Sequence, residues 1–596
     1  MASDRPDAGG ADPRSESRAE SLDSPESLES PESPESLGSL ESRSRPAADA
    51  LRSGTAAANE VEADLLLPER QVDDLEAQPA GQMSREGLQQ SAVRGAVWTV
   101  IHTFIAIPVA FLVNLLMARV LGAADYGRLA FLTALMEVVS RMLTAGFGSA
   151  VIQFGAKAHA AGRTEAVSRL LSQSQGFRLL VVMPVLSVVV LLFADVPTSA
   201  VVIAIVFGIV VPAALDGAVA CLTIESKTAE GAKIALVTSL ATQVAVVAVV
   251  LAARTPDAVW TTRLIVSGVA VALCLVPISA VYRRAVLRPV LPKGMPIGFW
   301  PYALPVGLAS VIGGLVMSRS EIFFMNWLAA PAAVGVFALA FGLAGHVFAP
   351  AQAFVGPLVP AISGLMEIDA PAVRPAFRRV LRAGATVVGL VMAVAVVPLA
   401  VLVPVLYGPE FAEAGPVVVA LGVSAGFVTV ASPVVAFVSA RLSAGEMLRA
   451  TSVALVVDVV LALALIPPLG VWGAVIANVG GSMTSLLLLT RSELRGLGIT
   501  VSLAARDALP CFVGAALAGG LMLAGDAAPG GEWARAVGVA LMGGLLYVAV
   551  LRVTRSGLTG PDADAIIRAL PRPARRVGPW VLGLLTARAL DEPGTP

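Results

Sequence analysis

Several ionisable side chains lie inside long apolar stretches of this 596-residue chain, and they are its first candidates for chemistry. Glu137 and Arg141 are four residues apart, so a helix over 128–151 would place both on one face near its middle. Charges are costly inside a bilayer, and they mark either a functional site or an ion pair packed between helices. An arginine there could bind phosphate oxygens through its planar guanidinium group.

Arg319 and Glu321 form a second candidate group, towards the outer end of the apolar stretch 301–328. They are two residues apart, so a helix would point them to different faces. Arg319 could line an outer gate of a passage through the membrane. Alternatively, both side chains could extend to the membrane surface while their stems stay in the apolar layer.

Asp216 and Asp458 are isolated carboxylates in the apolar stretches 200–223 and 448–468. Each of them, like Glu321, could bind a proton or a sodium ion and couple its movement to a conformational change. The alternative is an acid at a helix contact that is protonated or bonded to a Ser or Thr hydroxyl.

The elements that must position these residues are about fourteen apolar runs of roughly 18–25 residues, each long enough to cross a hydrocarbon core about 30 Å thick. The chain is 56% hydrophobic and only 14% charged. We therefore predict an all-α polytopic membrane protein. The predicted spans are 95–118, 128–151, 178–194, 200–223, 232–253, 264–282, 301–328, 332–356, 383–407, 416–440, 448–468, 470–490, 507–525 and 534–554.

Basic residues alternate between the predicted loops. If the N-terminus is cytoplasmic, the inner loops carry 19 Lys and Arg residues and the outer loops carry 5. Because basic residues favour cytoplasmic loops, we predict a multi-pass protein of the cytoplasmic membrane with both termini in the cytoplasm.

The first 90 residues differ from the rest of the chain. They hold 20 acidic and 8 basic residues, and the stretch 21–36 repeats Ser-Pro-Glu and Ser-Leu-Glu. Such a sequence buries too little apolar surface to offset the entropy of ordering, so we expect a disordered cytoplasmic tail. It could dock a partner or be phosphorylated, or it could be a dispensable solvated tail.

No motif for a cofactor, a metal ion or nucleic acid is present. The three cysteines lie within apolar runs without metal-ligand spacing, and no ATP-binding sequence occurs. The short outer loops argue against a membrane glycosyltransferase, which usually needs a substantial external domain. We therefore expect a protein that is not an enzyme and that needs no cofactor.

An internal repeat divides the predicted spans. Residues 117–130 align without gaps with residues 325–338 at an offset of 208, and six spans separate the two segments. Two halves of equal orientation suit a transporter whose lobes rock about a central cavity. The predicted organisation is a tail at 1–90, an N-lobe at 91–300, a C-lobe at 301–500, two further helices at 501–556 and a cytoplasmic C-terminal tail at 557–596.

The first repeat also carries a family resemblance. The segment Arg119-Val-Leu-Gly-Ala-Ala-Asp-Tyr-Gly127, followed by a helix ending Gly146-Phe-Gly-Ser-Ala150, resembles the first hairpin of polysaccharide flippases of the O-antigen or Wzx type. These belong to the multidrug/oligosaccharidyl-lipid/polysaccharide (MOP) exporter superfamily. The segments 301–305, 334–337 and 406–411 resemble the second half of that family. Within the first motif, the family positions are Arg119, Gly122, Tyr126 and Gly127.

The resemblance implies two six-helix lobes around a central cavity, with two peripheral helices. It implies a transporter that flips an oligosaccharide on a polyprenyl pyrophosphate by alternating access, for the synthesis of a cell-surface polysaccharide. Arg141, Glu137 and Arg319 would then contact the substrate, and membrane lipids and polysaccharide assembly enzymes would be its partners.

Three alternatives stay open. Lipid II flippases of the superfamily usually carry an Arg-Asp pair after the Leu-Gly of the first motif, whereas Leu121-Gly122 is followed here by Ala123 and Ala124, which weakens that reading. A multidrug or cation antiporter would place acids in the cavity. A membrane scaffold that transports nothing would recruit envelope enzymes through the acidic tail.

Overall fold

The computed structural model describes the chain between Arg85 and Thr586, and the first residues, 1–84, lie outside the described part. The described stretch has gaps at 145, 293, 319, 353–361, 363–364, 367–368, 441–443, 526–530 and 570–577. Most of the predicted tail is therefore not described, and its last residues belong to a helix that begins at Arg85.

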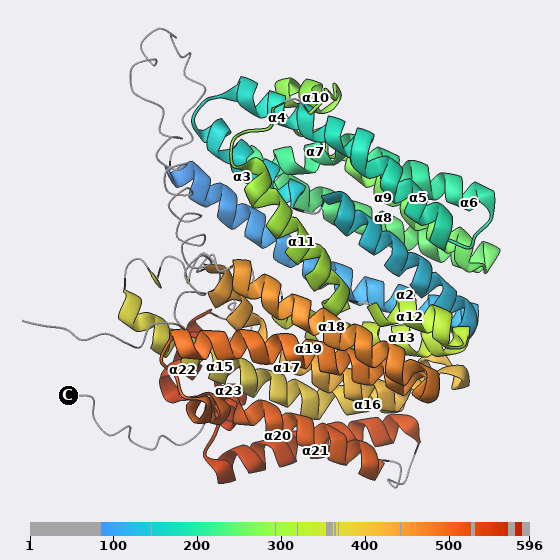
Figure 1. The fold of residues 1–596 in the computed structure, drawn as a ribbon. Helices are drawn as coiled ribbons and strands as arrows, with labels where there is room; N and C mark the ends of the chain where they lie inside the picture. Colours follow the sequence, from blue (N-terminus) through green and yellow to red (C-terminus); the bar gives the residue numbers. More distant parts are fainter. Residues whose placement is uncertain are drawn as a thin grey trace, which may run out of the picture. The chain divides into compact units, whose positions relative to one another are not determined.

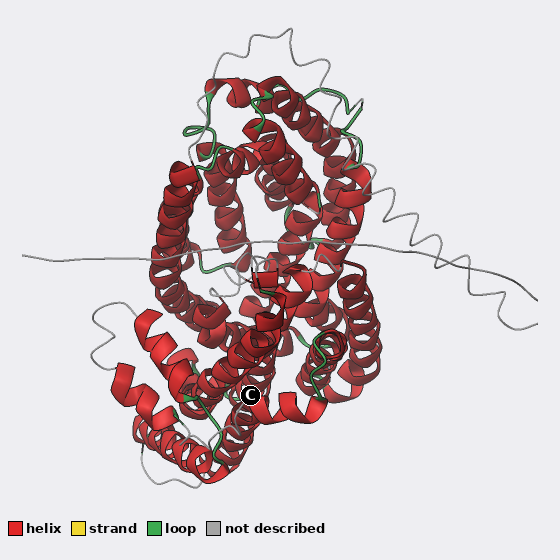
Figure 2. Ribbon diagram, turned by 90° about the vertical axis from the view of Figure 1, so that its left-hand side faces the viewer, coloured by secondary structure: helices red, strands yellow, loops and turns green. Residues whose placement is uncertain are grey.

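The described residues form helices joined by loops, as Figure 2 shows. The first half comprises α2 (Arg85–Thr144), α3 (Phe147–Ala160), α4 (Thr164–Phe177), η2 (Arg178–Val182), α5 (Met183–Phe193), α6 (Thr198–Ile203), η3 (Ala204–Val210), α7 (Val211–Ile224), α8 (Thr228–Ala253), α9 (Pro256–Leu273) and α10 (Ala280–Val286).

The second half comprises α11 (Phe299–Ser318), α12 (Ser320–Leu328), α13 (Pro331–Gln352), α15 (Ala370–Val391), η4 (Met392–Val396), α16 (Val397–Tyr407), η5 (Pro409–Phe411), α17 (Ala414–Ala440), α18 (Ala444–Leu469), α19 (Val471–Gly496), α20 (Val501–Gly525), α21 (Glu532–Thr554), α22 (Gly560–Ala569) and α23 (Gly578–Leu585).

Helix α2 is a hairpin of two helices. Gly122 interrupts it with φ 74° and ψ 173°, a conformation that glycine adopts without strain. The Tyr126 hydroxyl donates to Asn114 Oδ1 at 3.0 Å, although twelve residues of a straight helix would span about 18 Å. The chain therefore doubles back at Gly122, between the first and second predicted spans.

Among the described residues, eleven helical segments are long and apolar enough to cross a membrane, which confirms the predicted all-α polytopic class. The first of them is the hairpin with α3, and α9 and the pair α11–α12 lie in the predicted sixth and seventh spans. The sixth span is shifted from its predicted 264–282: it begins at Pro256, ends at Leu273 and is followed by the separate helix α10. Proline favours the first turn of a helix, and Pro277 lies just beyond the end of this one.

Figure 1 shows α3–α10 on one side of α2 and α15–α23 on the other, with α11–α13 between them. The turns of the bundle lie at two ends. We call one end the hairpin end, because the α2 hairpin turns there at Gly122. Asp195 and Asp257 lie at the same end, where the Arg128 guanidinium contacts the backbone oxygen of Asp195 and the carboxylate of Asp257. Glu410 lies there too, because it contacts Ala123 beside Gly122. We call the opposite end, with the turns at 161–163, 225–227, 274–279, 287–298 and 497–500, the basic end.

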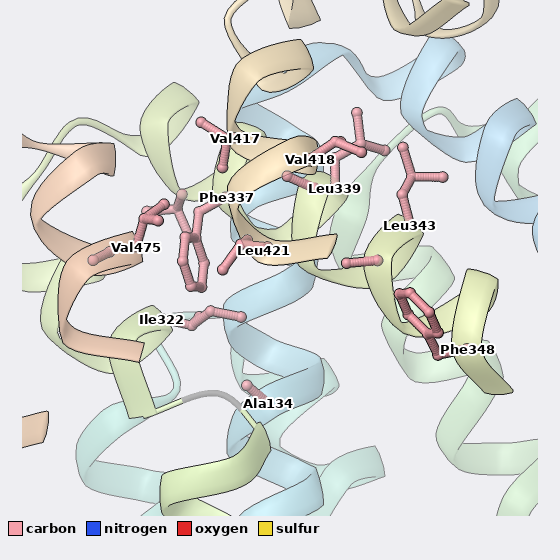
Figure 3. Packing of buried hydrophobic residues seen from close by; sticks show 14 of the residues in the cluster. Ala134, Ile322, Phe337, Leu339, Leu343, Phe348, Val417, Val418, Leu421 and Val475 are labelled. Atoms are coloured by element: carbon pink, nitrogen blue, oxygen red, sulfur yellow. The ribbon is translucent and has the colours of Figure 1, made fainter. Parts of the chain in front are cut away.

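Three apolar clusters hold the helices together. The largest joins α2, α12, α13, α17 and α19, and Figure 3 shows side chains of these helices packed around Phe337 and Leu421. A second joins α3, α4, α7, α10 and the start of α11, and the third joins α15, η4, α20 and α21 with the C-terminal helices. Many large apolar side chains stay exposed, for example Leu192, Val244 and Leu523, as expected where a helix faces lipid. The protein is therefore a multi-pass membrane protein.

Candidate functional site

The family-motif residues meet the second half of the chain at the hairpin end. The Arg119 guanidinium donates to the backbone oxygen of Val405 at 3.0 Å, and Tyr126 packs edge-on against Phe411 with ring centroids 6.0 Å apart. Two sequence motifs that lie almost 300 residues apart, 119–127 and 406–411, thus form one contact between the two halves.

Glu410 closes this contact. Its Oε2 accepts a hydrogen bond from the backbone N–H of Ala123 at 3.1 Å. A Cβ on Gly122 would lie 2.9 Å from the same oxygen, and the backbone there has positive φ. The positive φ therefore favours glycine at this turn, and the Glu410 carboxylate covers it closely.

The equivalent glycines of the internal repeat contact each other. A Cβ on Gly127 would overlap the backbone oxygen of Pro331, and a Cβ on Gly335 would overlap that of Ala123. Both pairs are related by the offset of 208 found in the sequence, so each half presents the same surface to the other. This arrangement is typical of a contact about a local two-fold axis.

The predicted pair Glu137–Arg141 lies in the second half of α2 and forms an ion pair with 2.9 Å between Oε1 and Nη2. The side chains of Glu137 and Arg141 are 35% and 40% exposed. They are therefore not the ion pair packed between helices that was the alternative to a functional site. They belong to a polar stripe of partly exposed or exposed side chains at helical spacing: Thr133, Glu137, Ser140, Arg141 and Thr144. Such a stripe on a membrane-crossing helix fits a water-filled space better than lipid.

Arg319 lies outside the described residues, between α11 and α12, so its side chain is not placed. Glu321, the candidate for ion coupling two residues further on, is fully buried in α12. The alternative that Glu321 extends to the membrane surface is therefore wrong, because α12 packs into the large apolar cluster.

Glu321 and Asp458 are brought together from helices α12 and α18. Asp458 is fully buried and accepts a hydrogen bond from the Ser320 hydroxyl at 2.5 Å, and Glu321 lies beside both Asp458 and Asn478 of α19. Among the described residues, both Glu321 oxygens, Asp458 Oδ1 and the Asn478 amide nitrogen have no hydrogen-bond partner of normal geometry. Three helices thus direct a small group of unsatisfied polar atoms, mostly oxygens, into one buried spot.

Asp216 is not isolated, contrary to the prediction. Its Oδ2 lies 2.7 Å from Nη1 of Arg178, and the same nitrogen donates to Gln175 at 3.2 Å. Arg178 is only 1% exposed although it is the first residue of the predicted span 178–194. Helix α4 begins at Thr164, so Arg178 lies about 21 Å further along the span. The signal that could have revealed it is the amphipathic sequence of 164–177, which extends the helix N-terminal to the apolar run.

The arginines of α15 form an ion-pair network. Arg378 contacts Asp507 of α20 at 2.7 Å, and Arg379 and Arg382 contact Asp562 of α22 at 3.1 and 2.8 Å. Both carboxylates are at most 5% exposed. This network ties the last part of the chain to α15 at the basic end.

Comparisons with known proteins agree with this architecture. Residues 92–366 match a family model described as polysaccharide biosynthesis protein. The structure resembles a lipid II flippase MurJ in an inward closed conformation, with a TM-score of 0.56, 11% identity, and coverage of 76% of this chain and 98% of that chain. It also resembles an inward-facing multidrug resistance MATE family transporter of the MOP superfamily, with a TM-score of 0.50, 17% identity, and coverage of 67% and 98%. No curated protein matches the chain in sequence. At these identities the two structures show the fold alone.

Proposed function

We propose that this chain belongs to the polysaccharide biosynthesis family whose model matches residues 92–366, and that it flips a lipid-linked oligosaccharide across the cytoplasmic membrane. Its likeness in fold to MOP-superfamily transporters supports this proposal. The polyprenyl pyrophosphate would enter from the cytoplasmic side, and the oligosaccharide would leave on the outer side for assembly into a cell-surface polysaccharide.

The observation that carries this proposal is the polar stripe of α2 with the Glu137–Arg141 pair at its centre. The pair is about 35–40% exposed although it lies in a membrane-crossing helix, so it is open to a polar ligand. The Arg141 guanidinium could exchange the Glu137 carboxylate for the oxygens of a pyrophosphate. Glu137 would then neutralise Arg141 whenever the site is empty. Arg319 is proposed as a second substrate contact from the other half.

We propose that the contacts at the hairpin end form and break during the transport cycle. Glu410 on Ala123 and the Gly127–Gly335 crossing hold the two halves together at this end. Breaking them would open the outer side, and the halves would then separate there while closing at the basic end. A substrate drives such a cycle only if it binds the two states with different affinity.

The buried group at Glu321 and Asp458 is proposed as the ion-coupling site. Two adjacent buried carboxylates require a compensating cation, because like charges in an apolar interior repel strongly. A proton or a sodium ion among the oxygens of Ser320, Glu321, Asp458 and Asn478 would satisfy them. Asp216 is a weaker candidate for this role since Arg178 already neutralises it.

The test is the leaflet location of polyprenyl-pyrophosphate oligosaccharide in cells depleted of the protein. We expect accumulation on the cytoplasmic side, relieved by the intact chain and not by Arg141→Ala. Arg374→Ala, which removes an exposed arginine at the basic end, is the matched control and should restore transport. If the Arg141→Ala form, at normal expression, fully relieved the accumulation on the cytoplasmic side, Arg141 would not be a substrate-binding residue.

The buried carboxylates also support a second candidate, a cation-coupled multidrug antiporter of the same superfamily. An unchanged leaflet distribution on depletion, together with increased sensitivity to cationic drugs, would favour the antiporter over the flippase.

A further inference from the structure

A groove of about 580 Å³ opens at the basic end between α4 and the segment of α10 that continues to Val290. It lies apart from the polar stripe of α2 and from the buried carboxylates. Its lining brings together Arg169 of α4 with Arg284 and Arg288 of the α10 segment. Arg169 therefore shares one small space with two arginines that are more than 100 residues away in sequence.

The charge of this groove is only partly neutralised. Arg169 lies 3.4 Å from Glu165, but both side chains are largely exposed, at 68% and 89%, so the pair is loose. Within the described part of the chain, neither Arg284 nor Arg288 has an acidic partner in contact distance. The arginines of α15, by contrast, are paired with buried aspartates. The groove thus keeps a positive charge that would attract an anion.

The walls of the groove are fixed by the backbone. The Ser172 hydroxyl donates to the Ala285 oxygen at 2.8 Å, and the Val290 N–H donates to the Ser172 oxygen at 3.0 Å. Gly176 lets the chain approach so closely that a Cβ there would overlap the oxygen of Val290. Tyr282 of α10 is buried, and its hydroxyl is hydrogen-bonded to Nδ1 of His159 at 2.7 Å. The arginines therefore project from a preformed scaffold.

Exposed apolar side chains surround the same arginines. Val281, Leu287, Val290 and Leu291 are all more than half exposed, and each lies within three residues of Arg284 or Arg288 in the sequence. A short segment with arginines and exposed aliphatic side chains, joining two membrane helices, is typical of the headgroup boundary of a bilayer. Its arginines meet phosphates while its aliphatic groups reach the acyl chains.

We propose that this groove binds the phosphate headgroup of an anionic phospholipid in the surrounding leaflet. The charge, the fixed walls and the aliphatic rim each match one part of such a lipid: the phosphate, the glycerol region and the acyl chains. The proposal does not depend on what the protein transports. A lipid bound there would fasten α10, and with it the connection into α11, to the membrane surface.

The test uses the purified full-length chain in detergent and counts bound lipids by native mass spectrometry. Phosphatidylglycerol and phosphatidylcholine of identical acyl chains are offered at equal concentration. We expect about tenfold higher occupancy with phosphatidylglycerol for the intact chain, and loss of that preference in Arg169→Gln/Arg284→Gln/Arg288→Gln. A single Arg284→Gln variant should lose part of the preference for phosphatidylglycerol. It replaces the triple variant in the test if the triple variant does not fold.

The matched control is Arg374→Gln/Arg491→Gln/Arg495→Gln, which removes three exposed arginines elsewhere with the same change in net charge. It should keep the preference. An equal loss in both triple variants would reduce the effect to overall charge and overturn the proposal. So would displacement of the lipid by millimolar inorganic pyrophosphate with formation of a pyrophosphate adduct, because the groove would then be a site for soluble phosphates.

Discussion

At the scale of single residues, exposure separates the ionisable side chains of the membrane helices into three kinds. Glu137 and Arg141 are paired but open, and Arg178 with Asp216 is paired and mostly buried. Glu321 and Asp458 are fully buried, with carboxylate oxygens that have no partner among the described residues. An open pair can exchange partners, whereas the two members of a buried pair compensate each other's charge, and adjacent buried carboxylates require a cation or protonation. We therefore assign the three groups to substrate, structure and coupling ion.

Removing the carboxylates of the proposed ion site should uncouple transport from the ion gradient. Glu321→Gln and Asp458→Asn are each expected to lower gradient-driven flipping about tenfold and to leave the gradient-independent rate in place. The measurement is transport in vesicles with an imposed proton or sodium gradient. Asp125→Asn changes an exposed carboxylate at the hairpin end and should behave as the intact chain. Unchanged coupling in both buried variants would exclude this site.

The Arg178–Asp216 pair predicts an asymmetric result in stability. Removing one partner leaves the other charge unpaired in an apolar environment, at a cost of about 3–5 kcal/mol. Arg178→Met or Asp216→Asn should therefore lower Tm by several degrees in a thermal scan of the detergent-solubilised protein. The double variant Arg178→Met/Asp216→Leu should recover most of the loss, since an apolar pair of similar volume needs no compensation. A double variant as unstable as the single ones would contradict a purely electrostatic role.

At the scale of the elements, the crossing of α2 and α13 decides how closely the two halves approach. Gly127 and Gly335 lack the side chains that would overlap the facing backbone, so the helices meet backbone to backbone. Such close crossings depend on small residues. Elsewhere, the π-helical segments η2 and η3 lie inside membrane-crossing helices, whose backbone stays helical on both sides of them.

A methyl group at Gly335 should therefore open the hairpin end. We expect Gly335→Ala to separate α2 from α13 there and to increase labelling of a reporter Ala123→Cys by a membrane-impermeant maleimide. Ala123 is only 5% exposed in the closed contact, and the native cysteines are buried, so background labelling is low. Gly345→Ala on the same helix meets open space and should leave labelling unchanged. Equal labelling in both variants would exclude the crossing as a gate.

At the scale of the whole molecule, the last helices pack mainly against α15 and against η4 and α16, which continue it along the chain. The arginines Arg378, Arg379 and Arg382 bind Asp507 and Asp562, and the Tyr547 hydroxyl donates to the Thr386 oxygen at 2.8 Å. These three arginines of α15 are thus directed at the protein itself.

The acidic N-terminal region offers a test of transport against scaffolding. A flippase should keep its activity when residues 2–84 are deleted, because the proposed sites lie in the helical part. The measurement is the same leaflet assay, with membrane expression as the control. Loss of activity at normal expression would favour a scaffold that works through this region.

The sequence alone predicted what depends on local composition. Apolar runs of membrane-spanning length predicted the polytopic fold, and the residues 119–127 and 406–411 resemble a superfamily with members of the same fold. Glu137 and Arg141 were predicted as a pair because helical spacing is a local property, and the structure contains that ion pair. The lobe boundaries and the side of the membrane on which the termini lie stay predictions.

Only the tertiary structure decided which distant residues meet. It joined Glu321 to Asp458, which the sequence had treated as separate candidates, and it gave Asp216 a partner in Arg178. It also brought Glu410 onto Ala123 and Gly335 onto Gly127. Spacing along one helix determines which residues share a face, but which faces pack together depends on the shapes of all the helices at once.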